Sequence, residues 1–112
     1  MSEDRAEYKY VRPLPCVRDE RGEIKEQMLK MLMSKIDEEL NEFKQAVINH
    51  QSFDLPCVAV GKNKVFWMDV AEEAADTITA ITTLCSALGI DADMRSRAQD
   101  RVNQKNFRRG RL

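Results

Sequence analysis

The chain has 112 residues, of which 33% are charged, 43% are hydrophobic and 6% are aromatic, and its formal net charge is −1. This length allows one domain with a modest core, and the composition is typical of a soluble helical protein rather than of a disordered or membrane protein. A net charge near zero gives no basis for binding nucleic acid by bulk attraction, and no apolar run approaches the ~20 residues that span a bilayer. We therefore expect neither nucleic acid nor a membrane among its partners.

The cysteines and the amino terminus indicate a cytoplasmic protein. Cys16, Cys57 and Cys85 are an odd number of thiols without a CxxC spacing, which argues against a disulfide framework and for a reducing compartment. The first ten residues are polar and lack the apolar segment of a signal peptide.

The chain divides into an arm and one helical domain. Residues 1–21 contain Pro13 and Pro15 and show no helical period, so we expect an extended arm that lies over the surface or over a partner subunit. Residues 22–112 form the domain.

The longest periodic segment runs from about residue 22 to 50 and predicts a helix. Its apolar residues recur at steps of three and four: Leu29, Leu32, Ile36, Leu40, Phe43 and Val47. At 100° per residue, Glu39 falls about 60° from Ile36, at the margin of this stripe, and Glu42 about 60° further round on the same side. Glu38 lies nearly opposite the stripe.

Residues 51–67 break the helical pattern. Two short strands at 58–60 and 65–67 about a turn at 61–64 would form a β-hairpin, and an irregular loop is the alternative. Trp67 is a candidate for stacking on a base, with a buried core position as the alternative.

Two more helices follow, at about 68–88 and 92–107, with Gly89 as terminator of the first and Asp91 as N-cap of the second. The apolar stripe of the first is Val70, Ala74, Ile78, Ile81, Leu84, Cys85 and Leu88, and its acidic edge is Asp69, Glu73 and Asp76. The last helix is only thinly apolar, so we expect it to pack against the other two.

Carboxylates therefore border the buried stripe on two long helices. Such acids are commonly solvated surface, and Lys35 with Glu39 fits that interpretation. If the stripes pack so that the acidic edges approach, a cation is needed to offset the repulsion. All candidate donors are carboxylate oxygens, which suit Mg²⁺ or Mn²⁺ better than Zn²⁺. The single histidine, His50, follows no Glu-x-x spacing, which argues against a di-iron bundle.

The end of the chain is basic. After Asp100 there is no acidic side chain, and five basic ones follow, namely Arg101, Lys105, Arg108, Arg109 and Arg111. Together with a metal-binding acidic edge, this segment fits a polyphosphate ligand, although a solvated tail is the alternative. No P-loop motif is present.

These motifs resemble the MazG-like all-α nucleoside triphosphate pyrophosphohydrolases, which are related to dimeric dUTPases and phosphoribosyl-ATP pyrophosphohydrolases. The family signature is E-E-x-x-E on one helix and E-x-x-D on the next, and residues 38–42 and 73–76 match it in order. Residues 88–91 and 103–110 also resemble the family's last helix. The resemblance covers about residues 28–110.

The resemblance implies an enzyme that hydrolyses a (d)NTP to the monophosphate and pyrophosphate with Mg²⁺. Glu38 matches the first acid of the motif and would be catalytic, orienting water or a further metal. The implied metal ligands are Glu39, Glu42, Glu73 and Asp76. Lys105, with Asn103 or Asn106 and Arg109, would contact phosphates.

The chain departs from the family pattern at two places: the gap of thirty residues between Glu42 and Glu73 is slightly long, and the arm replaces the usual preceding helix. We expect an all-α helical bundle completed by oligomerisation, as a homodimer or homotetramer, with a short irregular or β-hairpin insert. The alternative function is a non-catalytic nucleotide-binding or oligomeric interaction module.

Overall fold

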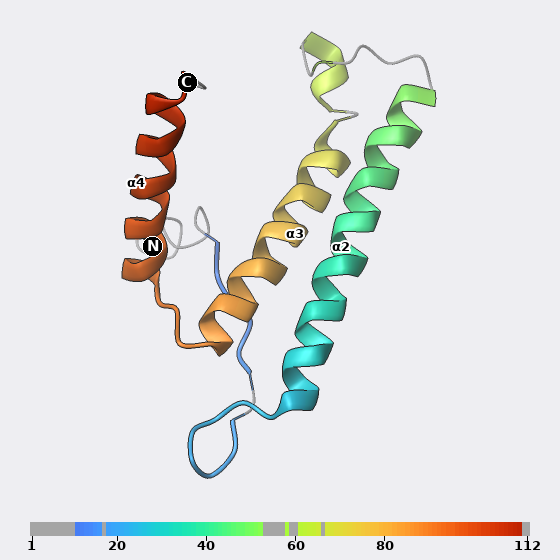
Figure 1. Ribbon diagram of the computed structural model, residues 1–112. Coiled ribbons are helices and arrows are strands. Elements are labelled where there is room, and N and C mark those ends of the chain that lie inside the picture. Colours follow the sequence, from blue (N-terminus) through green and yellow to red (C-terminus); the bar gives the residue numbers. More distant parts are fainter. Residues whose placement is uncertain (1–10, 17, 53–57, 59–60, 66, 111–112) are drawn as a thin grey trace, which may run out of the picture.

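The computed structural model describes all residues except 1–10, 17, 53–57, 59–60, 66 and 111–112. The described residues form three α-helices: α2 (Glu26–Ser52), α3 (Met68–Ala87) and α4 (Ala92–Arg108). The short 3₁₀ helix η1 (Gly61–Lys64) lies between α2 and α3 (Figure 1). No strand occurs in the part of the chain described, so the predicted all-α class is confirmed.

The predicted helix boundaries agree with the structure to within a few residues. α3 ends where expected, because Gly89 adopts a φ of 84°, a left-handed conformation that glycine takes without a Cβ penalty. Asp91 is the N-cap of α4, and its Oδ1 accepts a hydrogen bond of 2.9 Å from the amide of Met94. The insert carries η1 where a turn was expected. The predicted strands fall partly on residues 59, 60 and 66, outside the described residues, so the hairpin stays a prediction.

α2 and α3 pack against each other as an antiparallel pair (Figure 1). Their contact faces are turned from the apolar stripes toward the acidic edges. On α2, Glu39 is only 8% exposed whereas Leu40 is 37% exposed. On α3, Thr77 is buried whereas Ile78 and Ile81 are 49% and 46% exposed. The apolar stripes thus take part in the contact only partly, since Val70 of the α3 stripe is buried and Ile36 and Phe43 of the α2 stripe are half-buried.

Threonines make this contact face of α3 possible. The hydroxyl of Thr77 donates to the carbonyl of Glu73 at 3.0 Å, and that of Thr83 donates to the carbonyl of Thr79 at 2.7 Å. Bonding one turn back satisfies each hydroxyl within the helix, so a small polar side chain can be buried at low cost. The face is narrow enough for the acidic edges of the two helices to meet.

The arm lies along α3 of its own chain. The amide of Leu14 donates to the hydroxyl of Thr83 at 3.0 Å. The guanidinium of Arg18 donates to the carbonyls of Ser86 and Ala87, both at 3.2 Å. These carbonyls belong to the last turn of α3, where that of Ser86 also accepts a hydrogen bond of 3.0 Å from the amide of Gly89. A cation there opposes the negative end of the helix dipole.

The isolated protomer is open. α4 stands apart from α2, with α3 between them in Figure 1, so the expected packing of α4 against both other helices is not seen. Among the described residues, Val70 and Ala87 are the apolar residues that are buried. Large apolar side chains that are exposed among the described residues include Leu40, Ile78, Ile81, Leu88 and Phe107. Much apolar surface is therefore left without a partner.

Candidate metal centre

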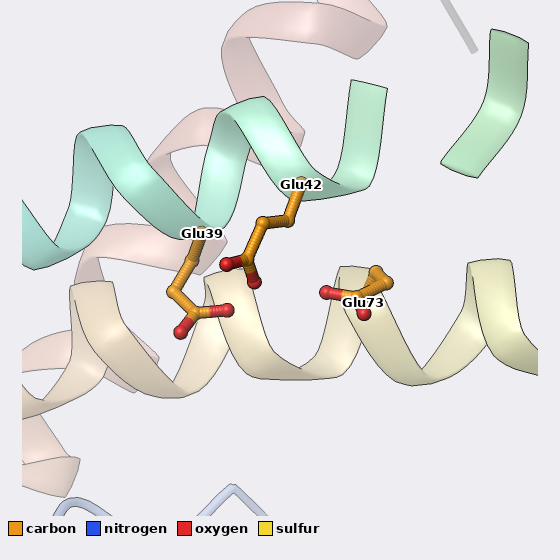
Figure 2. A group of neighbouring side chains, drawn as sticks. All are labelled: Glu39, Glu42 and Glu73. Atoms are coloured by element: carbon orange, nitrogen blue, oxygen red, sulfur yellow. The ribbon is translucent and has the colours of Figure 1, made fainter. Parts of the chain in front are cut away.

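Three carboxylates meet on one side of the α2–α3 pair. Glu39 and Glu42 come from consecutive turns of α2, and Glu73 comes from α3 opposite them (Figure 2). One oxygen of each lies within 4.8 Å of the others. Opposite ligands around Mg²⁺ are about 4.2 Å apart, since each bond is about 2.1 Å long. The three groups need only small side-chain movements to share one ion.

The hydrogen bonding of these acids is suited to binding a cation. Glu39 Oε2 and Glu73 Oε2 are buried, and neither has a hydrogen-bond partner among the described residues. A buried carboxylate oxygen without a donor is costly and rare in folded proteins. Carboxylate oxygens alone form the set, which is the chemistry that hard divalent cations prefer.

Lys35 neutralises only part of the negative charge. Its Nζ lies 2.8 Å from Glu39 Oε1, and this hydrogen bond raises the pKa of the lysine. The pKa of Glu42 is raised. The largest cause is the charge of Glu39, followed by desolvation and the charge of Glu73. Three carboxylates facing one ammonium leave an excess of about two negative charges, which a divalent cation would balance.

Removing the Glu42 charge is expected to stabilise the metal-free protein. A folded-state pKa above the unfolded value means that the folded state takes up the proton first, so stability rises as pH falls through that pKa and is lost again as pH rises. Glu42→Gln should therefore raise the apo melting temperature at neutral pH by a few degrees and shrink the stabilisation by Mg²⁺. Differential scanning calorimetry with and without Mg²⁺ measures both quantities. As the control, Glu38→Gln lies outside the cluster and should change neither the apo melting temperature nor the stabilisation by Mg²⁺.

Asp76 lies beside the three glutamates rather than among them. It is exposed and lines, with Glu39, a hollow of about 130 Å³ between the two helices. A larger hollow of about 600 Å³ lies between the arm turn and the start of α2 and holds none of the candidate ligands. The structure thus brings three of the four predicted ligands together and places the fourth next to them.

The remaining predicted site residues lie elsewhere in the protomer. Glu38 is on α2 but outside the cluster, 3.7 Å from Lys35 and 59% exposed in its side chain. The phosphate-binding candidates are on or just after α4, apart from the acids (Figure 1). They are Asn103, Lys105, Asn106 and Arg109. Asn103 accepts a hydrogen bond of 3.0 Å from Gln99 within the helix.

Trp67 forms a cluster with His50 and Asp69, here called the clasp, where the end of α2 meets the start of α3. Its ring stacks on His50, with centroids 5.0 Å apart and planes at 22°. His50 Nε2 lies 2.6 Å from Asp69 Oδ1, and since an ionised carboxylate only accepts, the ring nitrogen donates. Asp69 therefore bonds across to α2 instead of joining the cluster. Sequence spacing could not reveal this pair, because its members lie at the ends of two different helices.

Asp69→Asn is expected to open this clasp. The hydrogen bond from His50 lowers the pKa of Asp69, so its stabilisation is present above the ordinary aspartate range and is lost as pH falls through the lowered value. Trp67 is the sole tryptophan, and its fluorescence should titrate below that range in the wild type. The variant should show red-shifted emission at neutral pH and lack the transition. Asp37→Asn, an exposed acid of α2, should retain both wild-type properties.

Comparison of the chain with protein-family models, with curated proteins and with solved structures gave no match. None of the described helices is long and apolar enough to cross a membrane. The chemistry of the acidic cluster and the geometry around it are therefore the basis for assigning a function.

Proposed function

We propose that this protein is a Mg²⁺-dependent nucleoside triphosphate pyrophosphohydrolase, with Mn²⁺ able to replace Mg²⁺. The observation that carries the proposal is the meeting of Glu39, Glu42 and Glu73 from two helices, with buried oxygens that have no donor among the described residues. The type of reaction is inferred from the order of these acids, which resembles the E-E-x-x-E and E-x-x-D motifs of MazG-like enzymes.

In this proposal the chain holds the polyphosphate through a bound cation. Glu39 and Glu73 present the buried oxygens, Glu42 closes the set, and Asp76 stands at the edge of the adjoining hollow. A divalent cation held by these carboxylates would offset the negative charge that develops on the phosphate during the reaction. Water attacks the α-phosphorus, the bond from that phosphorus to the bridging oxygen breaks, and pyrophosphate leaves. The proton of the water passes to solvent or to an exposed carboxylate at the rim.

We further propose that the active form is a homodimer or homotetramer. By the helical period, Leu40 of α2 lies about 160° from Glu42 and Ile78 of α3 about 140° from Glu73, so both face away from the acids. Ile81 lies about 80° from Glu73, nearer the contact between the two helices. All three are exposed. A second copy packing on these residues completes a bundle.

The basic residues of α4 then have a role that the single protomer does not give them. Lys105 and Arg109, with Asn103 or Asn106, stand away from the acids of their own chain (Figure 1). In an assembly they can contact the phosphates held by the acidic cluster of another copy, because ammonium and guanidinium groups are strong donors to phosphate oxygens.

Pyrophosphate release tests the function directly. The protein should release pyrophosphate and monophosphate from at least one common ribo- or deoxyribonucleoside triphosphate with Mg²⁺, and excess EDTA should stop the reaction. If no nucleotide is cleaved by the folded protein, the enzyme proposal is wrong for those substrates. Calorimetry with a non-hydrolysable triphosphate then decides the alternative, since heat that requires Mg²⁺ indicates a non-catalytic nucleotide-binding module.

A further inference from the structure

The small hollow beside the acidic cluster has a wall that comes from the arm. Its volume is about 130 Å³, and Glu39, Asp76 and Lys35 are its charged members. The rest of its lining is apolar or small. These residues are Leu14 from the arm, Leu32 from α2, and Thr79, Ala80 and Thr83 from α3. A group attached to a polyphosphate at the cluster would extend into this hollow.

Leu14 is held at this place by its backbone. Its amide donates to the Thr83 hydroxyl at 3.0 Å, and Thr83 is itself only 4% exposed. Four residues on, Arg18 binds the end of α3 and also the carbonyl of Gly22 at 2.9 Å. The arm is thus anchored on both sides of Cys16, and the Leu14 side chain, 63% exposed, forms the rim of the hollow rather than its floor.

We propose that Leu14 is a specificity-determining residue for the ligand of the acidic cluster, because the arm pinned at Thr83 limits the size of the group that fits beside Asp76. The proposal rests on the function proposed above. Its expected consequence for a nucleotide is that, with Leu14 in place, a single-ring pyrimidine base is accepted better than a two-ring purine.

The physical basis is steric exclusion by a fixed wall. An apolar pocket discriminates between ligands by about tenfold or more for each methylene that fits or clashes. Truncating Leu14 to alanine removes three carbons from the rim and leaves the hydrogen bonds of the backbone in place. The larger hollow should accept purines, with the change in KM rather than in kcat, since the Leu14 side chain carries no group that could take part in the reaction.

Steady-state kinetics of the 112-residue chain provide the first test. The ratio of kcat/KM for the best common pyrimidine dNTP to that for the best purine dNTP should fall at least about tenfold in Leu14→Ala. Val11→Ala is the matched control, because it shortens an exposed aliphatic side chain of the same arm that is not part of the hollow. Its ratio should equal that of the wild type.

Amide exchange followed by NMR provides a second test that needs no turnover. The Leu14 amide should exchange at least about tenfold more slowly than in an unstructured peptide. Thr83→Val, which removes the accepting hydroxyl, should abolish this protection and lower the kinetic ratio as Leu14→Ala does. Thr83→Ser keeps the hydroxyl and should retain both.

The outcomes separate the two proposals. A Leu14→Ala protein that is active with the wild-type ratio overturns the role of Leu14 alone. The role of Leu14 is also overturned if its amide in the wild-type protein shows no protection from hydrogen exchange. A wild-type protein that cleaves no nucleotide overturns the proposed function and with it the substrate preference, and this is seen before any variant is compared.

Discussion

Glu73→Gln is expected to lower turnover at least ~100-fold, as loss of a metal ligand does, and to remove the stabilisation that Mg²⁺ gives the wild type. Glu73 is the acid that α3 contributes to the cluster (Figure 2). Without its charge, Glu39 and Glu42 would form a site on one helix only. Glutamine keeps the length of the side chain and one carbonyl oxygen, so a loss of activity reports charge and coordination rather than shape.

The matched control is the neighbouring acid. Glu72 is exposed on α3 and lies outside the cluster, so Glu72→Gln should retain activity within about twofold. Turnover is measured as pyrophosphate release and metal binding as the Mg²⁺-dependent rise in melting temperature. A Glu73→Gln protein with full turnover would remove the acidic cluster from the mechanism. A variant that is inactive yet still stabilised by Mg²⁺ would place the cation elsewhere.

Ile81→Glu is expected to dissociate the assembly and abolish activity. Ile81 is 46% exposed in the protomer and belongs to the apolar stripe of α3, on which the proposed second copy packs. Burying an unpaired carboxylate in such an interface costs several kcal/mol, enough to shift the association constant by several powers of ten. Activity should be lost with it, because the basic residues of α4 would no longer meet the acids of another copy.

Sedimentation velocity measures the assembly directly. Gln45→Glu serves as control, since it introduces the same charge at an exposed position of α2 on the polar side of the helix, and it should leave the oligomer intact. A wild-type protein that sediments as a monomer and turns over nucleotide would contradict the proposed assembly. An Ile81→Glu variant that remains oligomeric would move the interface to another face.

The helices and the acidic site were predictable from the local sequence pattern. The face that each helix turns toward the other was not. Steps of three and four residues identified α2 and α3, and Gly89 and Asp91 marked the boundary of α4 correctly. The same pattern placed Ile78 and Ile81 in the core of a stripe, and they are exposed in the protomer. A hydropathy pattern counts threonine as polar even when its hydroxyl bonds to a carbonyl one turn back in the same helix. Such a pattern therefore could not predict that Thr77 lies in the helix contact.

The site was predicted in composition but not in detail. Spacing indicated that Glu39 and Glu42 share an edge of one helix and that Glu73 does so on the next. It could not separate Asp76, which stands beside the cluster, from the three acids within it. It also grouped Asp69 with the acidic edge, because a hydrogen bond to His50 depends on how two helix ends meet in space.

The anchoring of the arm on α3 sets an order of events during synthesis. The arm is made first, but its acceptors, Thr83 and the carbonyls of Ser86 and Ala87, lie up to 69 residues later in the chain. At 5–20 residues per second the arm waits roughly 3–14 s for them. Leu14 therefore reaches its place beside the acids only after both helices that carry those acids exist. The wall of the hollow therefore cannot form before the acidic cluster that it borders.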